Sequence, residues 1–270
     1  SFSPMLHPDD QLTGIHYRLL PMTRSIIAEM VTPEQAGKNM KLIDKHLACP
    51  DGVRLMDAPT RYDGGVSHLF RRAEQAANVG REISLQYTHA HIRYIEALAK
   101  LGEGSKAWDA LFRITPIGIT EAVPNARLRQ ANLYFSSSDG CFPDRFRYSE
   151  EFSRLRNGTI DVKGGWRLYS SGPGIYFHQL VAALLGVRFE QDALVIDPVL
   201  PASMDGLRLT LCCFGRPCTF VYRAGGEKGI SCGGKALPVS PVGNPYRTGG
   251  WRLSKETLLA AEGDITVTAL

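Results

Sequence analysis

The chain of 270 residues has little that would place it at a membrane or on nucleic acid. It contains no apolar run near the ~20 residues that a membrane span requires. It also has no dense run of lysine and arginine interleaved with aromatic residues, and its formal net charge of +4 is small for this length. We therefore expect neither a membrane protein nor a nucleic-acid-binding protein.

Cysteine patterns typical of metal sites are also missing. No CxxC pair and no histidine at zinc-finger spacing accompanies the six cysteines, which are Cys49, Cys141, Cys212, Cys213, Cys218 and Cys232. Because free cysteine mostly behaves as a small hydrophobic residue, we expect buried thiols and no metal. The N-terminal stretch SFSPMLHPDDQ lacks the zones of a signal peptide, so we expect a cytoplasmic protein.

The first half of the chain does show helical periodicity. Apolar residues recur at helical spacing over 15–30, 33–46, 87–101 and 105–114, and a further helix is plausible over 67–77. Thr32 precedes Pro33 as an N-cap before the second of these helices. Paired helices of this length favour an α/α barrel or toroid, and no short solenoid repeat is visible.

Residues 115–165 are rich in turn formers and indicate a long irregular segment. Loops of this length are usually functional or disordered. This one combines Asn, Gln and Arg with aromatic residues, which are the groups that sugar hydroxyls and sugar rings need. We interpret it as a functional, sugar-contacting segment.

The stretch 164–186, GGWRLYSSGPGIYFHQLVAALLG, predicts a loop that leads into a helix. Ser171 or Gly172 suits the cap, and Pro173 suits the first turn. Gly186 suits the stop. Free backbone N–H groups and a serine hydroxyl at this positive helix end favour an anion such as phosphate. A capped helix packed in a core explains the same pattern, and caps are commoner than anion sites.

After residue 186 the pattern changes to short β-prone runs. They lie at 193–197, 207–213, 218–222 and 265–269, with Pro, Gly and Asp turns between them. Their spacing is typical of antiparallel sheets and predicts a β domain of the sandwich type. We therefore expect an α + β multidomain chain, with a helical domain over 1–188 and a β domain over 189–270.

Four segments together resemble the inverting β-glucoside phosphorylases. They are GREISLQYTHAHIRYIEALAKLG, PNARLRQANLYFSSSDG, GGWRLYSSGPGIYFHQLVAALLGVR and ALVIDPVLPASMDGLRL. That family includes cellobiose, cellodextrin, cellobionic acid and chitobiose phosphorylases and the phosphorylase domain of cyclic β-glucan synthases. The sequences PNARLRQANLYFSSSD and VKGGWRLYSSGPGIY most resemble the cellobionic acid branch. The resemblance implies the C-terminal part of an (α/α)6 barrel followed by a jelly-roll-like sandwich.

The resemblance also implies a reaction and its phosphate ligands. In the family, inorganic phosphate attacks the anomeric carbon of a β-glucoside and releases α-glucose 1-phosphate, a hexosyl transfer that needs no further cofactor. His89 matches the family's phosphate histidine, and Ser171 with Gly172 matches its hydroxyl–glycine pair. Taken alone, His89 is better explained as a core histidine, whereas the motif around it favours the phosphate ligand. His91 points elsewhere on a helix, so we expect it either to serve packing or to support the ligands from behind.

Substrate residues carry over less directly. Glu82 matches a family glutamate, although Ile83, Ser84 and Leu85 replace the Asn-Gly-Gly that usually follows it. Gln130 matches a sugar-contacting glutamine. Arg61 and Arg81 flank the expected acceptor side, where a guanidinium would suit a carboxylated acceptor.

One departure concerns the family's general acid, an aspartate in a tryptophan-rich segment without counterpart in residues 1–270. We therefore expect the C-terminal portion of a larger enzyme, inactive by itself and homodimeric at full length, with the remainder of that enzyme as its partner. A non-catalytic carbohydrate-binding module, with Trp166, Tyr134 and Phe135 as stacking residues, is the main alternative. A cyclic β-glucan synthase domain and a glycoside hydrolase that uses water remain open as well.

Overall fold

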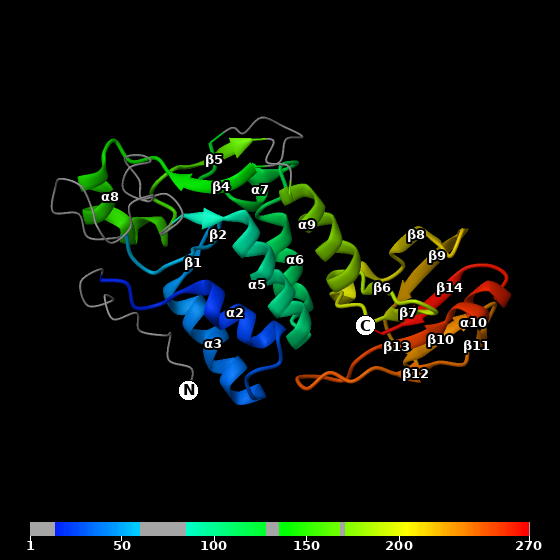
Figure 1. Cartoon of the computed structure of the whole chain (residues 1–270). Coiled ribbons are helices and arrows are strands. Elements are labelled where there is room, and N and C mark those ends of the chain that lie inside the picture. Colours follow the sequence, from blue (N-terminus) through cyan, green and yellow to red (C-terminus); the bar gives the residue numbers. More distant parts are fainter. Residues whose placement is uncertain (1–13, 60–84, 128–134, 168–170, 270) are drawn as a thin grey trace. The chain divides into compact units, whose positions relative to one another are not determined.

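The computed structural model describes residues 14–59, 85–127, 135–167 and 171–269, and it shows helices together with mixed β sheets, an α + β protein (Figure 1). Its contacts divide the chain into two compact units. Unit 1 draws on residues 1–97 and 109–176, and unit 2 on residues 98–108 and 177–270.

Unit 1 contains a helical hairpin that the sequence predicts well. Helix α2 spans Leu19–Ile27, and helix α3 spans Pro33–His46. The Thr32 hydroxyl accepts from the Gln35 N–H at 3.2 Å, and the Gln35 side chain accepts from the Thr32 N–H at 3.0 Å. This capping box satisfies two backbone donors at the helix start, so the predicted cap is confirmed.

The long helices α5, Thr88–Leu101, and α6, Gly104–Phe112, lie close to the predicted ranges. Buried positions on α5 include Ile92, Ile95 and Leu98, which recur at helical spacing. The predicted helix over 67–77 falls outside the described residues.

Unit 1 also holds a small hairpin and a three-stranded sheet. Strands β1, Ala48–Cys49, and β2, Gly52–Val53, pair with each other. The sheet has the order β3-β4-β5, with β3 at Gln86–Tyr87, β4 at Phe135–Gly140 and β5 at Val162–Arg167. Both of its pairings are antiparallel.

These strands correct the interpretation of 115–165 as irregular. The segment includes α7 at Ile119–Ala122, β4, α8 at Arg145–Glu151, the 3₁₀ turn η1 at Phe152–Leu155 and most of β5. Strand β4 reads FSSSDG, and after Phe135 it has none of the β-branched and aromatic residues that normally signal a strand. It is almost entirely buried because it pairs on both sides.

Helix α9 spans Ser171–Gln179 and continues as a π-helix, η2, at Leu180–Leu184. Ser171 is the first residue of the helix rather than its cap. Gly186 has φ +73°, and a Cβ there would lie 2.2 Å from the Asp197 carbonyl carbon. Only glycine fits this position, so the predicted stop after the helix is confirmed.

Unit 2 contains two sheets among its described residues. The four-stranded sheet has the order β12-β13-β7-β6, and the five-stranded sheet has the order β11-β10-β14-β9-β8. Their strands are β6 Val187–Phe189, β7 Ala193–Ile196, β8 Arg208–Cys213, β9 Arg216–Arg223, β10 Gly229–Cys232, β11 Lys235–Ala236, β12 Ser240–Pro241, β13 Trp251–Ser254 and β14 Ile265–Thr268. The turn η3 at Ala202–Met204 and helix α10 at Lys255–Ala260 complete the unit.

The four β-prone runs correspond to β7, β8, β9 and β14, so those predictions are confirmed. Strands such as β10 and β13 were not predicted, because they are short and contain glycine, cysteine or charged residues. The pairing of β9 with β14 is parallel, unlike the antiparallel arrangement expected. Phe220, Tyr222, Ile265 and Val267 of these two strands are all fully buried and form the centre of the unit's core.

Among the residues described, we find no helix with the length and apolar character to cross a membrane.

Candidate functional site

The candidate site lies at one edge of the β3-β4-β5 sheet. Tyr87 at the end of β3 and Gly165 near the end of β5 both stand opposite Ser137 of β4. Because β4 is antiparallel to each, β3 and β5 run parallel, and two strand spacings place them about 10 Å apart. Helix α5 begins directly after β3, and α9 begins four residues after β5 ends. Strands β3 and β5 therefore end at the same edge of the sheet.

His89 lies in the first turn of α5. Its ring stacks on Tyr87, with 5.1 Å between the ring centroids and an interplanar angle of 18°. Burial and, to a smaller extent, the positive charge of Arg93 lower the pKa of His89. The imidazole is therefore neutral near pH 7 and donates through a single ring N–H.

His91 faces the protein interior, as expected for a packing residue. It is 1% exposed. Its Nδ1 accepts from the Val53 N–H at 3.1 Å, and its Nε2–H donates to the Ala110 carbonyl at 2.8 Å. Burial lowers the pKa of His91 to about 4, which keeps the ring neutral in this arrangement. His91 therefore points away from the His89 side of the helix, as expected, and it is held by two buried hydrogen bonds.

A cluster of buried polar side chains underlies this junction. Asp51 and Arg54, each 1% exposed, form an ion pair in which Arg54 Nη2 donates to both Asp51 oxygens at 2.8 and 2.9 Å. Arg54 also donates to the Ser138 carbonyl at 3.2 Å. Gln86 and Thr88 are fully buried, and the Thr88 hydroxyl donates to the Phe135 carbonyl at 3.0 Å.

The second part of the expected phosphate site is the start of α9. Ser171 and Gly172 are its first two residues, where backbone N–H groups lack intrahelical partners. Gly172 is buried. The Tyr176 hydroxyl lies 2.9 Å from the Thr115 hydroxyl and ties α9 to the segment after α6. The register of the sheet relates Ser171 and Gly172 to His89, because β3 and β5 end at the same sheet edge.

The expected sugar residues Glu82, Gln130, Arg61 and Arg81 lie outside the described residues. The stacking role considered for Phe135 is wrong, because this ring is 3% exposed within β4.

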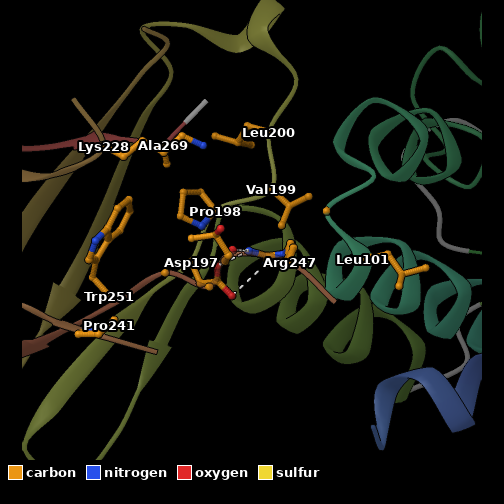
Figure 2. Close-up of a pocket in the computed structure, with 14 residues that line it drawn as sticks. Leu101, Asp197, Pro198, Val199, Leu200, Lys228, Pro241, Arg247, Trp251 and Ala269 are labelled. Carbon is orange, nitrogen blue, oxygen red and sulfur yellow. Dashed lines mark hydrogen bonds and ion pairs between the residues drawn. The ribbon is translucent and has the colours of Figure 1, made fainter. Parts of the chain in front are cut away.

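Unit 2 carries a pocket of about 620 Å³ that the sequence did not suggest (Figure 2). It is lined by Trp251, Pro198, Lys228 and an ion pair in which Arg247 donates to both Asp197 oxygens at 2.8 and 3.0 Å. The adjacent Gly249–Gly250 pair is the one sequence signal for it. A Cβ on Gly250 would lie 2.1 Å from the Ile196 carbonyl oxygen, and one on Gly249 would lie 1.9 Å from that of Val242.

The segment around this pocket also caps helix α5. Arg247 donates to the Ala99 carbonyl at 3.3 Å, and the Asn244 amide donates to the Lys100 carbonyl at 3.0 Å. These carbonyls lie in the last turn of the helix, where intrahelical donors run out. The segment that forms this pocket wall therefore also has a structural role, which is to cap α5.

In the part of the chain that the structure describes, no group of three or more His, Cys, Asp or Glu residues is arranged for a metal ion. All six cysteines are free, three of them buried (Cys213, Cys218 and Cys232) and Cys212 exposed. Burial and the neighbouring Cys218 raise the pKa of Cys213 to about 12, so its thiol is unreactive at neutral pH.

Two family models match the chain. Residues 11–137 match the catalytic domain of the glycosyl hydrolase 94 superfamily, and residues 186–266 match a glycoside phosphorylase C-terminal domain. The two matches follow the order of the two parts expected from the motifs.

Curated relatives agree with these models. The chain is 53% identical over 97% of its length to a 1,2-β-oligoglucan phosphorylase of Listeria innocua. It is 28% identical over 83% of its length to a cellobionic acid phosphorylase of Neurospora crassa, and 28% identical over 72% to a cyclic β-(1,2)-glucan synthase of Rhizobium meliloti. The preference for the cellobionic acid branch is thereby corrected in favour of the oligoglucan phosphorylase.

These relatives are much longer than the chain. It spans 24% of the length of the Listeria protein, 27% of the Neurospora protein and 6% of the Rhizobium protein. The motifs quoted above, the two family models and the 53% identity nevertheless agree on one family. The chain belongs to the glycosyl hydrolase 94 superfamily of β-glucoside phosphorylases.

Proposed function

We propose that this chain supplies the phosphate-binding part of the catalytic centre of an inverting β-glucoside phosphorylase. The observation that carries the proposal is the register of the β3-β4-β5 sheet, in which Tyr87 and Gly165 flank Ser137. That register sends the chain into α5 and α9 from one edge. His89 follows the first strand by two residues, and Ser171 follows the second by four.

The proposed reaction transfers a glucosyl group. A phosphate oxygen forms a bond to the anomeric carbon from the face opposite the leaving group, and the bond from that carbon to the glycosidic oxygen breaks. The electron pair of the broken bond stays on the leaving oxygen, which a carboxylic acid protonates. The products are α-glucose 1-phosphate and a shorter acceptor. Phosphate takes the place of activated water, so no second carboxylate base is needed.

The proposed role of this chain is to hold phosphate against the sugar. The neutral His89 ring donates one N–H, the Ser171 hydroxyl donates another hydrogen bond, and the Gly172 N–H adds a third. The start of a helix also favours the negative charge of phosphate. Holding the nucleophile in line with the anomeric carbon removes much of the entropic cost of the bimolecular step.

The substrate class that we propose is a β-1,2-linked glucose oligomer, because of the 53% identity to the Listeria oligoglucan phosphorylase. Glu82 and Gln130 are proposed to contact sugar hydroxyls, and Arg61 and Arg81 to lie on the acceptor side. Cellobionic acid is the second candidate, and the 28% identity to the Neurospora enzyme supports it. A carboxylated acceptor would use one of the two arginines as a bidentate partner.

The architecture that we propose completes this assignment. The helical hairpins α2–α3 and α5–α6 support part of an (α/α) barrel, with residues 1–188 as the catalytic part. The two sheets formed from β6 to β14 support a jelly-roll-like sandwich over residues 189–270.

The experiment measures glucose 1-phosphate release by the natural full-length polypeptide that carries this chain. Equal concentrations of β-1,2-oligoglucan, cellobionate and cellobiose are compared at saturating phosphate. We expect the β-1,2-oligoglucan to give the highest kcat/KM. A higher kcat/KM for cellobionate would instead identify cellobionic acid as the substrate. Absence of release from every β-glucoside would favour the non-catalytic carbohydrate-binding module.

The phosphate site is tested by His89→Ala and by Ser171→Ala. Each variant should raise the KM for phosphate more than the KM for the glucan, because each removes a hydrogen bond to phosphate. Phosphate should also raise the Tm of the wild-type protein, and it should do so less in the two variants. Equal effects on both substrates would contradict the assignment.

A further inference from the structure

The hairpin β1–β2 lies directly beneath the junction between β3 and α5, where His89 is located. The Val53 N–H of β2 donates to His91 Nδ1 at 3.1 Å, and the Leu55 N–H donates to the Leu85 carbonyl at 3.1 Å, just before β3. Figure 1 shows β1 and β2 beside the start of α5. Residues 48–55 and 85–91 are therefore held together by both backbone and side-chain hydrogen bonds.

The Asp51–Arg54 ion pair belongs to this hairpin and is fully enclosed. Both carboxylate oxygens accept from Arg54 Nη2, and Arg54 Nη1 donates to the Ser138 carbonyl. Ser138 stands opposite Gln86 in the register of β3 with β4. The guanidinium thus connects the hairpin to β4, the strand that also pairs with β5. A buried charge pair of this kind needs a reason, because desolvation offsets much of its attraction.

The residues on both sides of His89 are anchored by the same layer of buried polar side chains, which consists of Asp51, Arg54, Gln86, Thr88 and His91. Thr88 donates to the Phe135 carbonyl in β4, and His91 bridges Val53 and the Ala110 carbonyl. At Gly52, φ is +120° and a Cβ would lie 2.8 Å from the His91 ring. The hairpin therefore fits closely against the first turn of α5, with no room for a side chain between them.

The fully buried Gln86 side chain completes the layer. Its Oε1 lies 3.5 Å from the Thr88 hydroxyl, and its Nε2 lacks a hydrogen-bond partner within the described residues. A buried amide donor without a partner carries a cost that the surrounding contacts must offset. Among those contacts is the hydrogen bond from Arg54 to the carbonyl of Ser138, which stands opposite Gln86.

We propose that Asp51 and Arg54 are positioning residues for phosphate binding, because they hold β4 and the hairpin in the one arrangement that fixes the backbone around His89. The proposal rests on the proposed function, in which His89 binds phosphate. Neither residue touches phosphate, since both are enclosed beneath the sheet. Their effect on catalysis passes through the hairpin, His91 and the first turn of α5.

The physics of buried ion pairs provides a way to separate positioning from stability. Removing one partner leaves an uncompensated buried charge and is expected to unfold or strongly destabilise unit 1. Replacing both partners by apolar residues of similar volume is often tolerated, so the double variant Asp51→Leu with Arg54→Met should fold. That variant loses the hydrogen bond from Arg54 to the Ser138 carbonyl and with it the geometric restraint.

The experiment uses the natural full-length polypeptide with β-1,2-oligoglucan and inorganic phosphate. It measures KM for phosphate, kcat, and the phosphate-induced rise in Tm for wild type, His89→Ala and the double variant. The matched control is Asp197→Leu with Arg247→Met, which replaces the bidentate pair in unit 2. Arg54→Lys is included as a conservative variant that keeps the charge but lacks the planar fork that reaches Asp51 and the Ser138 carbonyl together.

We expect the double variant to raise KM for phosphate roughly tenfold to a hundredfold, as displacement of a binding group by about 1 Å can do. Its KM for the glucan should stay within about twofold, and the unit 2 control should leave KM for phosphate unchanged. Arg54→Lys should give an intermediate value. A double variant that folds and keeps the wild-type KM for phosphate overturns the positioning role, even if its Tm is lower.

The two proposals fail in different ways. If His89→Ala raises KM for phosphate and the double variant does not, only the positioning role is refuted. If His89→Ala leaves both KM for phosphate and the phosphate-induced Tm rise unchanged, the phosphate site is not at His89 and both proposals fall. If every variant, including the unit 2 control, shows the same loss, the effect is general destabilisation and positioning is also refuted.

Discussion

Replacement of His91 by glutamine tests how the buried layer responds to acid. The imidazole is fully enclosed, and both of its nitrogens are used, by the Val53 N–H and the Ala110 carbonyl. A protonated ring has no acceptor to offer Val53, and burial opposes the charge. The nearby Arg113 adds to this effect, whereas Asp51 partly counteracts it.

The size of the effect follows from the pKa of about 4 in the folded protein against the ordinary value of 6.5. Above pH 6.5 the ring is neutral in both states, so the full stability is present. As the pH falls from 6.5 toward 4, the unfolded chain takes up a proton that the folded protein refuses, and stability is lost. The total loss is about 3 kcal/mol, because one pKa unit corresponds to about 1.4 kcal/mol.

Urea unfolding at pH 7.5, 6.5, 5.5 and 4.5 measures this loss. His91→Gln should be less stable than wild type at pH 7.5 by about 1–3 kcal/mol, because the two buried hydrogen bonds are impaired. Its stability should then fall less steeply with acid than that of the wild type. The control is His178→Gln at an exposed position, which should retain the wild-type slope. If His91→Gln and wild type lose stability in parallel between pH 6.5 and 4.5, the reasoning about this ring is refuted.

Three further substitutions, two of them paired with a control variant, test other contacts by the same urea measurements. Gly52→Ala should destabilise the protein by about 1–3 kcal/mol, because φ is +120° and the new Cβ would lie 2.8 Å from the His91 ring. Its control is Gly37→Ala in helix α3, where a Cβ meets nothing within 4 Å, and this variant should stabilise the protein by about 0.5–1 kcal/mol. Asp197→Ala leaves Arg247 largely buried without its charge partner, so the free energy of unfolding should fall by about 2 kcal/mol or more. Its control is Asp264→Ala, which removes an exposed pair with Arg208 and should cost less than about 1 kcal/mol. Thr32→Ala should cost about 1 kcal/mol because it removes the capping box, and no change there would contradict the cap.

Local signals account for most of what was predicted correctly. Thr32 and Pro33 start a helix through contacts within four residues, and α5 shows its buried face at every turn. Strands β8 and β9 consist of alternating or continuous β-prone residues with a Gly turn between them. In such cases the hydrogen-bond partners lie close in sequence, so the pattern carries enough information.

Long-range pairing accounts for most of what was missed. Arg54 stands in a stretch rich in Pro, Gly and Asp that gives no signal of burial, yet it is buried and bonded to Asp51 and the Ser138 carbonyl. The serine run of β4 has no strand signature, because its burial comes from neighbours more than 25 residues away on either side. Neither fact is visible in a window of neighbouring residues.

For this protein, the sequence by itself determined the helices, the main strands of unit 2 and the motifs that indicate the family. Those features depend on short-range periodicity, on caps and on the identity of a few residues. The tertiary structure alone decided that β3 and β5 run parallel on either side of β4, that β9 pairs with β14 in parallel, and that a buried ion pair underlies the histidine junction. Strand register and burial depend on contacts between distant segments, and only the folded chain brings those segments together.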